Sequence, residues 1–497
     1  MKRIPKSFSL PANAIIAAML IYIYVGILFF LLAWCVWYVS IISTIVSIYV
    51  VYMMYRDFRS SDALEISFST ILGIVIMGVV LYAIGWGRFT PQPLDWRKHN
   101  AIINDLVSHD MPVIYKTEDG VVAMLTYYLA QYLFPSAIGK IFGSYRVAEV
   151  ANALWAYSGL ILVYLNVLRI VKSRTVVSNL TTLFFLLFMS YPIELGRQIL
   201  SLFIDGNPAS EEWFYWDDNI KLQYSGNIIL LAWVFPQIVV NWMVMSMFVE
   251  NYKKINYYVP LLLPALLYGS FSFIGLLPYA FVWVVYQFIV SSNKSSLVKE
   301  IFSAYNILTA LFLGTIIIFY LFGNIITEKP AMLSFGVIDY SNRYIVYIVF
   351  VCSIVLPYLL LLFKRERVIW LYYTTLVSLM IYPFFTMGLY NDFTMRTSIP
   401  SLFVLMLMLL KMIQDFRYSY VRSLLVVIIL FYSSKDSVIK IASTIKNDNY
   451  FELAEDESYG TMARFIGKDY NDIQADLIYN YYTYDLDQSF FCKYIAK

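Results

Sequence analysis

The stretch "PANAIIAAMLIYIYVGILFFLLAWCVWYVSIISTIVSIYVVYMMY", residues 11–55, carries no charged side chain and decides the fold class. A helix needs about 20 apolar residues to cross a hydrocarbon core of roughly 30 Å, and this stretch is about twice that long. It therefore predicts two membrane spans joined by a tight turn near residues 34–40. The prediction extends to the whole chain, because similar apolar runs recur along it.

The composition excludes an ordinary soluble protein. Of the 497 residues, 60% are hydrophobic and only 14% are charged, whereas soluble domains carry about 25% charged residues. Lipid offers no hydrogen-bond partners to open strand edges, so the sequence predicts an all-α polytopic bundle. The net charge of +3 is spread over many loops and indicates no nucleic-acid partner. The three cysteines form no plausible disulfide framework.

The distribution of Lys and Arg predicts how the chain threads the membrane. Short loops rich in these residues mark the cytoplasmic side, and both ends of the first apolar stretch are basic. This places the N-terminus in the cytoplasm, the C-terminus outside and about 13 spans between them, in a bacterial inner membrane. The spans are expected near residues 11–33, 41–55, 64–86, 147–168, 176–193, 226–249, a short pair within 257–290, 302–323, 343–363, 368–388, 397–413 and 420–435.

This topology divides the chain into three parts. We expect an N-terminal transmembrane hairpin over residues 1–63, a transmembrane core over 64–435 and an extracytoplasmic tail over 436–497. The polar loops lie mostly on the outer face, so any chemistry is expected there. These external segments are residues 87–146, 194–225, 324–342 and 389–396.

The first external loop begins with "LDWRKHNAIINDLVSHDMPVIY", residues 94–115. Asp95 is placed to cap a helix, and Lys98 and His99 follow it by three and four residues, so they project near it. Arg97 lies on a neighbouring polar face. Such a carboxylate could take a proton from a sugar hydroxyl while the cations hold a phosphate. The alternative is an interfacial helix with a capping Asp95 and solvated charges.

Two further features of this loop complete its interpretation. Its two histidines are ten residues apart and lack the spacing of a metal site. The run "VVAMLTYYLAQYLFPSAIGKIFG", residues 121–143, predicts a second helix in the outer interface, because its tyrosines combine an apolar ring with a polar end.

Two other external segments carry candidate binding residues. "EEWFYWDDNIKLQYSGN", residues 211–227, interleaves aromatic rings with acids, a pattern that suits a carbohydrate surface, with membrane anchoring as the alternative. "LYNDFTMRTSIP", residues 389–400, places Arg396 at the outer mouth of a span, where its guanidinium could grip a phosphate or simply pair with Asp392. The candidate sugar-binding residues are Glu211, Glu212, Trp213, Trp216, Asp217, Gln223, Gln237, Asn391 and Asp392.

The layout resembles the GT-C superfamily of integral membrane glycosyltransferases. The resemblance rests on an outward span, a long first external loop with an early acid and two interfacial helices, and a many-span bundle. The motifs that carry it include "DWRKHNAIINDL", "YYLAQYLFPSAIGKIFG", "FSFIGLLP" and "NDFTMRTSIP", which are similar to bacterial membrane proteins linked to surface polysaccharide. Two spans precede the core, which departs from the superfamily pattern.

The resemblance implies a membrane glycosyltransferase that moves a sugar from a polyprenyl-phosphate carrier to an envelope glycan or lipid-linked acceptor. Asp95 would be the catalytic base, and Arg396, with Arg97, Lys98 and His99, would bind the carrier phosphate. The superfamily's metal-binding DxD pattern is broken by Arg97, so the sequence does not support a divalent metal cofactor. An O-antigen-type polymerase and a non-enzymatic transporter or flippase of lipid-linked saccharide remain alternatives.

Overall fold

The first two helices form the predicted hairpin. In the computed structural model, which describes residues 7–203, 214–217, 220–323, 334–341, 343–363, 369–388, 391–445, 458–466, 468 and 479–497, α1 spans Ala12–Trp34 and α2 spans Trp37–Phe58. Both are long and apolar enough to cross a membrane. The predicted helical hairpin, with a turn within residues 34–40, is confirmed.

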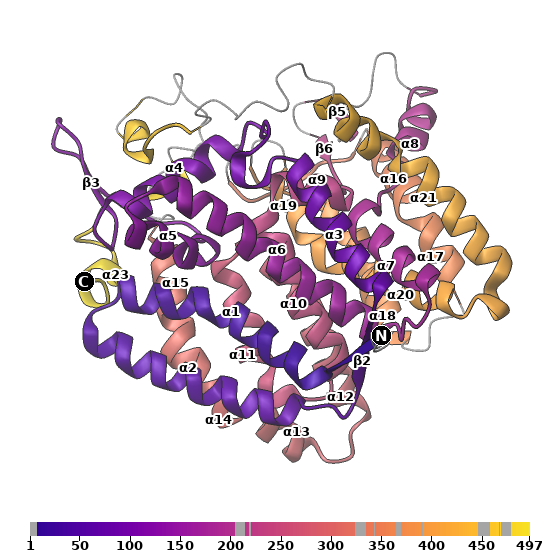
Figure 1. Cartoon of the computed structure of the whole chain (residues 1–497), viewed down its shortest axis with the longest axis horizontal. Coiled ribbons are helices and arrows are strands. Elements are labelled where there is room, and N and C mark those ends of the chain that lie inside the picture. The colour runs from indigo at the N-terminus through magenta and orange to yellow at the C-terminus, as the bar shows by residue number, and fades with distance from the viewer. Residues whose placement is uncertain are drawn as a thin grey trace, which may run out of the picture.

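Both ends of this hairpin are fastened by short strand contacts. At the open end, β1 (Ser7–Pro11) pairs antiparallel with β2 (Ala63–Ser67). At the turn, Cys35 forms a bridge with Ala496. The first and last described segments therefore lie at opposite ends of α1, and Figure 1 shows the N and C labels on opposite sides of the hairpin.

The bundle is mostly helical, with six helices in the described part long and apolar enough to cross a membrane, or eight if two bent pairs each count as one span. Besides α1 and α2, the long ones are α6 (Tyr145–Ile170), α12 (Ser270–Val290), Lys294–Phe322 and Asp392–Gln414. The bent pairs are α7 (Val176–Phe188) with α8 (Ile193–Leu200), and α16 (Tyr344–Ile354) with α17 (Leu356–Leu362).

The remaining helices overlap the other predicted spans or are segments of the long helices. Lys294–Phe322 contains α13 (Lys294–Ile301), α14 (Ala304–Thr309), a π-helical turn (Ala310–Gly314) and α15 (Thr315–Phe322). The others are α3 (Phe68–Ala83), α9 (Asn227–Trp233), α10 (Phe235–Asn251), α11 (Tyr258–Leu262), α18 (Ile369–Ile381), α19 (Asp392–Thr397), α20 (Ile399–Gln414) and α21 (Phe416–Ile445).

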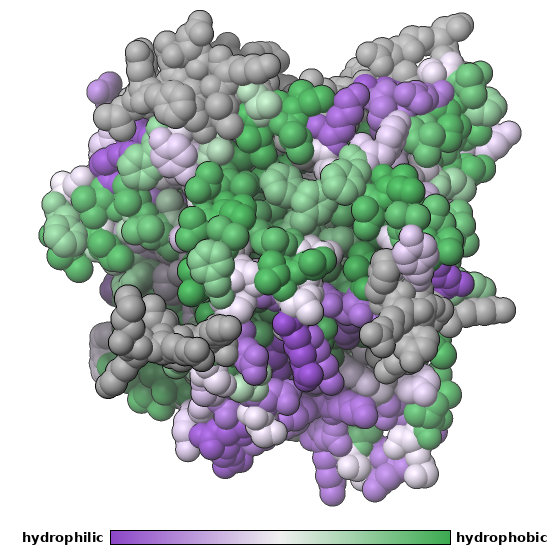
Figure 2. All heavy atoms as spheres, turned by 45° about the vertical axis from the view of Figure 1, so that its right-hand side comes forward, coloured by the Kyte–Doolittle hydropathy of each residue, from purple (hydrophilic) through white to green (hydrophobic). Residues whose placement is uncertain are grey.

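The surface has the polarity of a membrane protein. Figure 2 shows a broad hydrophobic band across one face, with hydrophilic residues gathered toward the lower edge. In the interior, α10 and α20 are buried almost along their whole lengths and pack against each other. Gln237 and Asn241 of α10 are buried, so these polar side chains face the protein interior.

The segment predicted to be the first external loop folds onto the bundle as two helices and a small sheet. Its helices are α4 (Trp96–Ser108) and α5 (Ala130–Phe142). Its strands β3 (Ile114–Lys116) and β4 (Val122–Leu125) pair with each other, and β4 also pairs with β9 (Tyr482–Thr483) of the tail. Two other small sheets pair β5 (Phe214–Asp217) with β6 (Ile220–Leu222) and β7 (Gly336–Val337) with β8 (Phe385–Thr386).

The structure corrects one prediction in this loop. We expected a single helix over residues 121–143, but β4 occupies its first part and α5 begins only at Ala130. The sequence of residues 121–143 does not indicate this division. The strand β4 forms because its backbone hydrogen-bonds to β3 on one side and to β9, in the distant tail, on the other.

Candidate functional site

Asp95 stands at the N-cap position, immediately before α4, but its side chain does not cap the helix. Its backbone is already in the right-handed helical region, and its side chain makes no capping hydrogen bond. Instead, Oδ1 of Asp95 lies 3.4 Å from Nζ of Lys98, an i,i+3 ion pair in which the lysine is buried. The expected proximity of these two side chains is confirmed, whereas the interpretation of Asp95 as a helix cap is wrong.

His99 is held in a tight aromatic setting between α4, α5 and α10. The hydroxyl of Tyr132 lies 2.7 Å from its Nδ1, and the ring contacts Trp96 and Phe235 edge-on. Burial, together with the charge of Lys98, lowers the pKa of His99 to about 3. His99 is therefore neutral at pH 7 and adds no positive charge with which to hold a phosphate.

Arg396 enters the same region from α19. Asn391, with a φ of 55°, starts this helix and its side chain accepts from the backbone N–H of Thr394. Asn391 also donates to the carbonyl of Lys221 at 2.9 Å, which ties α19 to β6. One turn into α19, Nη2 of Arg396 lies 2.9 Å from Oδ2 of Asp392. The ion pair between Asp392 and Arg396, which their i,i+4 spacing predicted as one alternative, is therefore present.

Tyr128 connects Arg396 to the first external loop. Its hydroxyl accepts from Nη1 of Arg396 at 3.2 Å and from Nε2 of Gln237 at 3.0 Å. The hydroxyl of neighbouring Tyr127 donates to it as well. Sequence reasoning missed Tyr128, although the Tyr127–Tyr128 doublet in an otherwise apolar stretch of an external loop was a usable signal.

These contacts bring together one centre from four distant parts of the chain, which we call the Arg396 centre: Asp95, Lys98, Tyr128, Gln237, Asp392 and Arg396. Burial raises the pKa of Asp95, but the positive charges of Lys98 and Arg396 outweigh it, and the pKa is lower than usual. Asp95 is therefore ionised at neutral pH, and its interaction with Arg396 shows that the two groups lie within electrostatic range.

The Arg396 centre has hydrogen-bonding capacity to spare. Within the described part of the chain, buried Nε of Arg396 and buried Oε1 of Gln237 have no hydrogen-bond partner. Buried polar atoms in native proteins are nearly always paired, so this unused donor and this unused acceptor are available to a ligand or to water. The donor is on a guanidinium, which binds phosphate or carboxylate oxygens.

The tail forms part of the wall of this centre. The ring of Tyr481 stacks on that of Tyr127, with centroids 4.3 Å apart. The backbone N–H of Thr126 donates to the carbonyl of Tyr481 at 2.8 Å, and the hydroxyls of Thr126 and Thr483 lie 2.7 Å apart. Through these contacts the tail supports the segment that carries Tyr127 and Tyr128.

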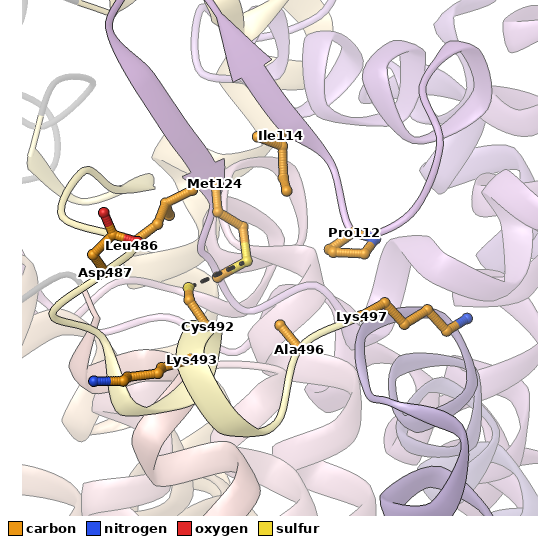
Figure 3. A pocket seen from close by; sticks show the side chains of 9 residues that line it. All are labelled: Pro112, Ile114, Met124, Leu486, Asp487, Cys492, Lys493, Ala496 and Lys497. Atoms are coloured by element: carbon orange, nitrogen blue, oxygen red, sulfur yellow. Dashed lines mark hydrogen bonds between the residues drawn. The ribbon is translucent and has the colours of Figure 1, made fainter.

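Further contacts fasten the tail to the same loop. Asp105 of α4, fully buried, accepts from the backbone N–H of Met462 at 2.8 Å and from the hydroxyl of Tyr115 at 2.7 Å. A cavity of about 410 Å³ lies between the β3–β4 ribbon and α23 (Phe490–Tyr494), and the sulfur atoms of Met124 and Cys492 on its wall are 3.9 Å apart. Figure 3 shows the side chains that line this cavity.

The other predicted site residues are placed differently. The side chain of Arg97 is exposed. Its backbone carbonyl accepts a hydrogen bond from the N–H of Tyr459 in the tail. Gln223 is buried and donates to Ser225 at 2.7 Å. Three sugar-binding candidates, Glu211, Glu212 and Trp213, lie outside the described residues. For Trp216 and Asp217 in β5 only the backbone is described.

Metal-binding side chains do not gather at the Arg396 centre. Among the described residues, no group of three or more His, Cys, Asp or Glu side chains is arranged to hold a metal ion. His99 has its Nδ1 engaged by Tyr132. The two carboxylates of the centre each face a cation, as the ion pairs of Asp95 and Asp392 show.

The chain was also compared with known proteins. No family model, curated protein or solved structure matches it. The geometry and charge of the Arg396 centre, together with the sequence motifs, are therefore the features that bear on function.

Proposed function

We propose that this protein is a GT-C-like membrane glycosyltransferase of about 13 spans in a bacterial inner membrane. It would transfer a sugar from a polyprenyl-phosphate carrier to an envelope glycan or lipid-linked acceptor on the extracytoplasmic face, with the N-terminus inside and the C-terminus outside. Helices that overlap every predicted span support the arrangement. The observation that carries the function is the Arg396 centre.

In this proposal the two buried cations bind the carrier phosphate. Arg396 offers its unpartnered Nε together with Nη atoms in a planar fork, and Lys98 adds a second charge. The carboxylates of Asp95 and Asp392 face these cations in the ligand-free protein. A phosphate would compete with them, and its negative charge would free Asp95 for a second role.

Asp95 would then act as the base. The carboxylate takes the proton of the acceptor hydroxyl, the hydroxyl oxygen bonds to the anomeric carbon, and the bond from that carbon to the phosphate oxygen breaks. The leaving phosphate departs on its carrier with the bonding electrons and remains paired with Arg396 and Lys98. A phosphate next to Asp95 would also raise its pKa toward the range that suits a general base.

The experiment measures sugar transfer in membranes supplied with lipid-linked sugar. Asp95→Asn keeps the size of the side chain but removes the base, so transfer should fall about 10²- to 10⁴-fold. Arg97→Gln is the matched control, because Arg97 is the exposed neighbour on the same helix, and it should retain transfer. Full transfer by Asp95→Asn would contradict the assignment of the base.

Arg396→Ala tests the carrier site separately. Binding of a polyprenyl phosphate to the purified protein should be lost, because no other described residue presents a free guanidinium nitrogen to this centre. Chain-length analysis of the cell's glycan after deletion of the protein then separates the transferase from the polymerase alternative. Loss of one sugar or branch indicates a transferase, whereas loss of polymer length alone would contradict it.

A further inference from the structure

A second site lies across α5 from the Arg396 centre. Tyr132 of α5 faces His99, and Phe134, two residues on, projects from the opposite side of the helix. There Phe134 and Ile138 line a groove of about 540 Å³ against α6. Its other lining residues are apolar except Arg146 and Ser158. Figure 1 shows α5 and α6 side by side at this position.

The length of the groove matches half a bilayer. Arg146 and Ser158 mark its two ends on α6, and 12 residues of helix rise about 18 Å. One leaflet of a bilayer contributes about 15 Å of hydrocarbon. Arg146 lies in the first turn of α6, a candidate membrane span that begins at Tyr145. When the groove lies at the depth of the lipid acyl chains, Arg146 therefore lies at the depth of the headgroups.

The groove opens to the surroundings of the bundle. Leu154, on its wall, is 61% exposed. Ile141 and Phe142, at the end of α5, continue this exposed apolar surface. The floor is firm, because Trp155 stacks on Tyr22 at 4.2 Å between ring centroids. Such a rigid trough between two helices fits a single hydrocarbon chain better than a polar ligand.

Charge at the upper end selects the headgroup. Glu149 is buried between two guanidinium groups, 3.2 Å from Arg88 and 3.0 Å from Arg146. Arg146 also lines the groove, so its guanidinium is the cation at this end that can meet a lipid phosphate. The side chain of Arg146 is the partly exposed member, at 29%. It stacks over Phe89 and donates to the carbonyls of Gly87 and Arg88, which hold it in place.

We propose that this groove binds one acyl chain of an anionic membrane phospholipid, with the lipid phosphate at Arg146. A groove that is one leaflet deep, capped by a cation and separated from the Arg396 centre by α5, fits a bilayer lipid and not the long carrier of the proposed reaction. The lipid site is independent of the proposed function.

The test uses purified full-length protein in nanodiscs of phosphatidylcholine containing a small fraction of dioleoylphosphatidylglycerol, with bound lipid measured by native mass spectrometry. Ala151→Phe fills the groove without altering the charge cluster, and Arg146→Gln removes the cation. Each should reduce retention of phosphatidylglycerol about tenfold. Arg174→Gln is the matched control, because Arg174 is an exposed cation beyond the other end of α6, and its retention should equal that of the unchanged protein.

Two outcomes would overturn the proposal. One is equal retention of phosphatidylglycerol by Ala151→Phe and the unchanged protein, which decides the matter even if Arg146→Gln fails to fold. The other is displacement of phosphatidylglycerol from the unchanged protein by added polyprenyl phosphate, which would show that the groove belongs to the carrier. Neither result depends on whether the protein transfers sugar, so the proposed function is tested separately.

Discussion

The two charge clusters of this protein are arranged in opposite ways. In the Arg396 centre the cations are buried and the acids are partly open, with side chains of Asp95 and Asp392 that are 31% and 37% exposed. In the Glu149 cluster, formed by Arg88, Arg146 and Glu149, the acid is 2% exposed and Arg146 is the more open partner. In the proposed function a ligand would displace the acids of the first cluster, whereas the second exposes the guanidinium of Arg146.

The difference indicates which cluster supports the fold. A buried carboxylate between two arginines is a fixed structural element, because removing it leaves uncompensated charge in the interior. A buried arginine with an unused donor, guarded by acids that can move into solvent, is arranged for exchange of partners. Four substitution or pH experiments test this contrast.

Glu149→Gln should destabilise the protein most. The substitution leaves Arg88 and Arg146 without their shared counter-charge, and breaking a buried ion pair costs roughly 3–5 kcal/mol of the free energy of unfolding. Thermal unfolding of the purified protein in detergent measures the loss. Glu118→Gln, on an exposed turn, is the control and should change nothing. Equal stability of the two variants would remove the structural role assigned to Glu149.

Arg396→Lys should affect transfer and not stability. Lysine keeps the charge but lacks the planar fork, so it cannot replace both the contact to Tyr128 and the free Nε donor. We expect transfer of lipid-linked sugar to fall about 100-fold, the usual scale for one lost transition-state donor. Arg146→Lys is the comparison and should transfer normally. A large fall in both variants, or in neither, would break the contrast between the clusters.

Acidic pH should lower the free energy of unfolding, because His99 is buried in its neutral form. Its folded-state pKa is about 3, because burial and Lys98 disfavour its protonation, while an unfolded histidine titrates near 6.5. Between these values only the unfolded chain binds the proton, so stability is full above about pH 6.5 and falls as the pH decreases. The loss is about 1.4 kcal/mol per pH unit, or roughly 2 kcal/mol by pH 5.

The measurement for His99 is the unfolding free energy between pH 7.5 and 5. His99→Asn retains a group that can hydrogen-bond to the Tyr132 hydroxyl and should flatten the pH dependence. His109→Asn is the control, because the side chain of His109 is 39% exposed, and it should keep the slope of the unchanged protein. If the slopes of all three proteins agree, His99 is not held neutral as described.

Tyr128→Phe should have the smallest effect. It removes the hydroxyl that Arg396 and Gln237 share, and a hydrogen bond contributes about 1 kcal/mol, which corresponds to a fivefold to tenfold change. We expect the KM for the lipid-linked sugar to rise by that factor while kcat changes less. Tyr157→Phe, which removes a hydroxyl bonded to the carbonyl of Ile74, is the control. A fall in kcat alone would place Tyr128 in the chemical step instead.

The features that the sequence predicted correctly depend on residues that are close together in the chain. The α1–α2 hairpin follows from an uncharged run of known length, and the Asp95–Lys98 and Asp392–Arg396 pairs follow from helical spacing. The sequence could not show that Tyr128 meets Arg396, because those residues are 268 positions apart and only packing brings them together. For the same reason, β4 was mistaken for the start of a helix: its partner β9 lies in the tail.

The third strand of the β3–β4–β9 sheet has a consequence for biosynthesis. Thr126 and Thr483, whose hydroxyls meet, are 357 residues apart. At a synthesis rate of about 5–20 residues per second, β4 waits roughly 20 to 70 s for β9 to leave the ribosome. During that time the membrane helices can insert and pack, but Tyr127 lacks Tyr481 behind it. The newly made protein would therefore reach the membrane before its site is complete, and a nonsense mutation ahead of β9 would yield an inserted chain with an unfinished wall.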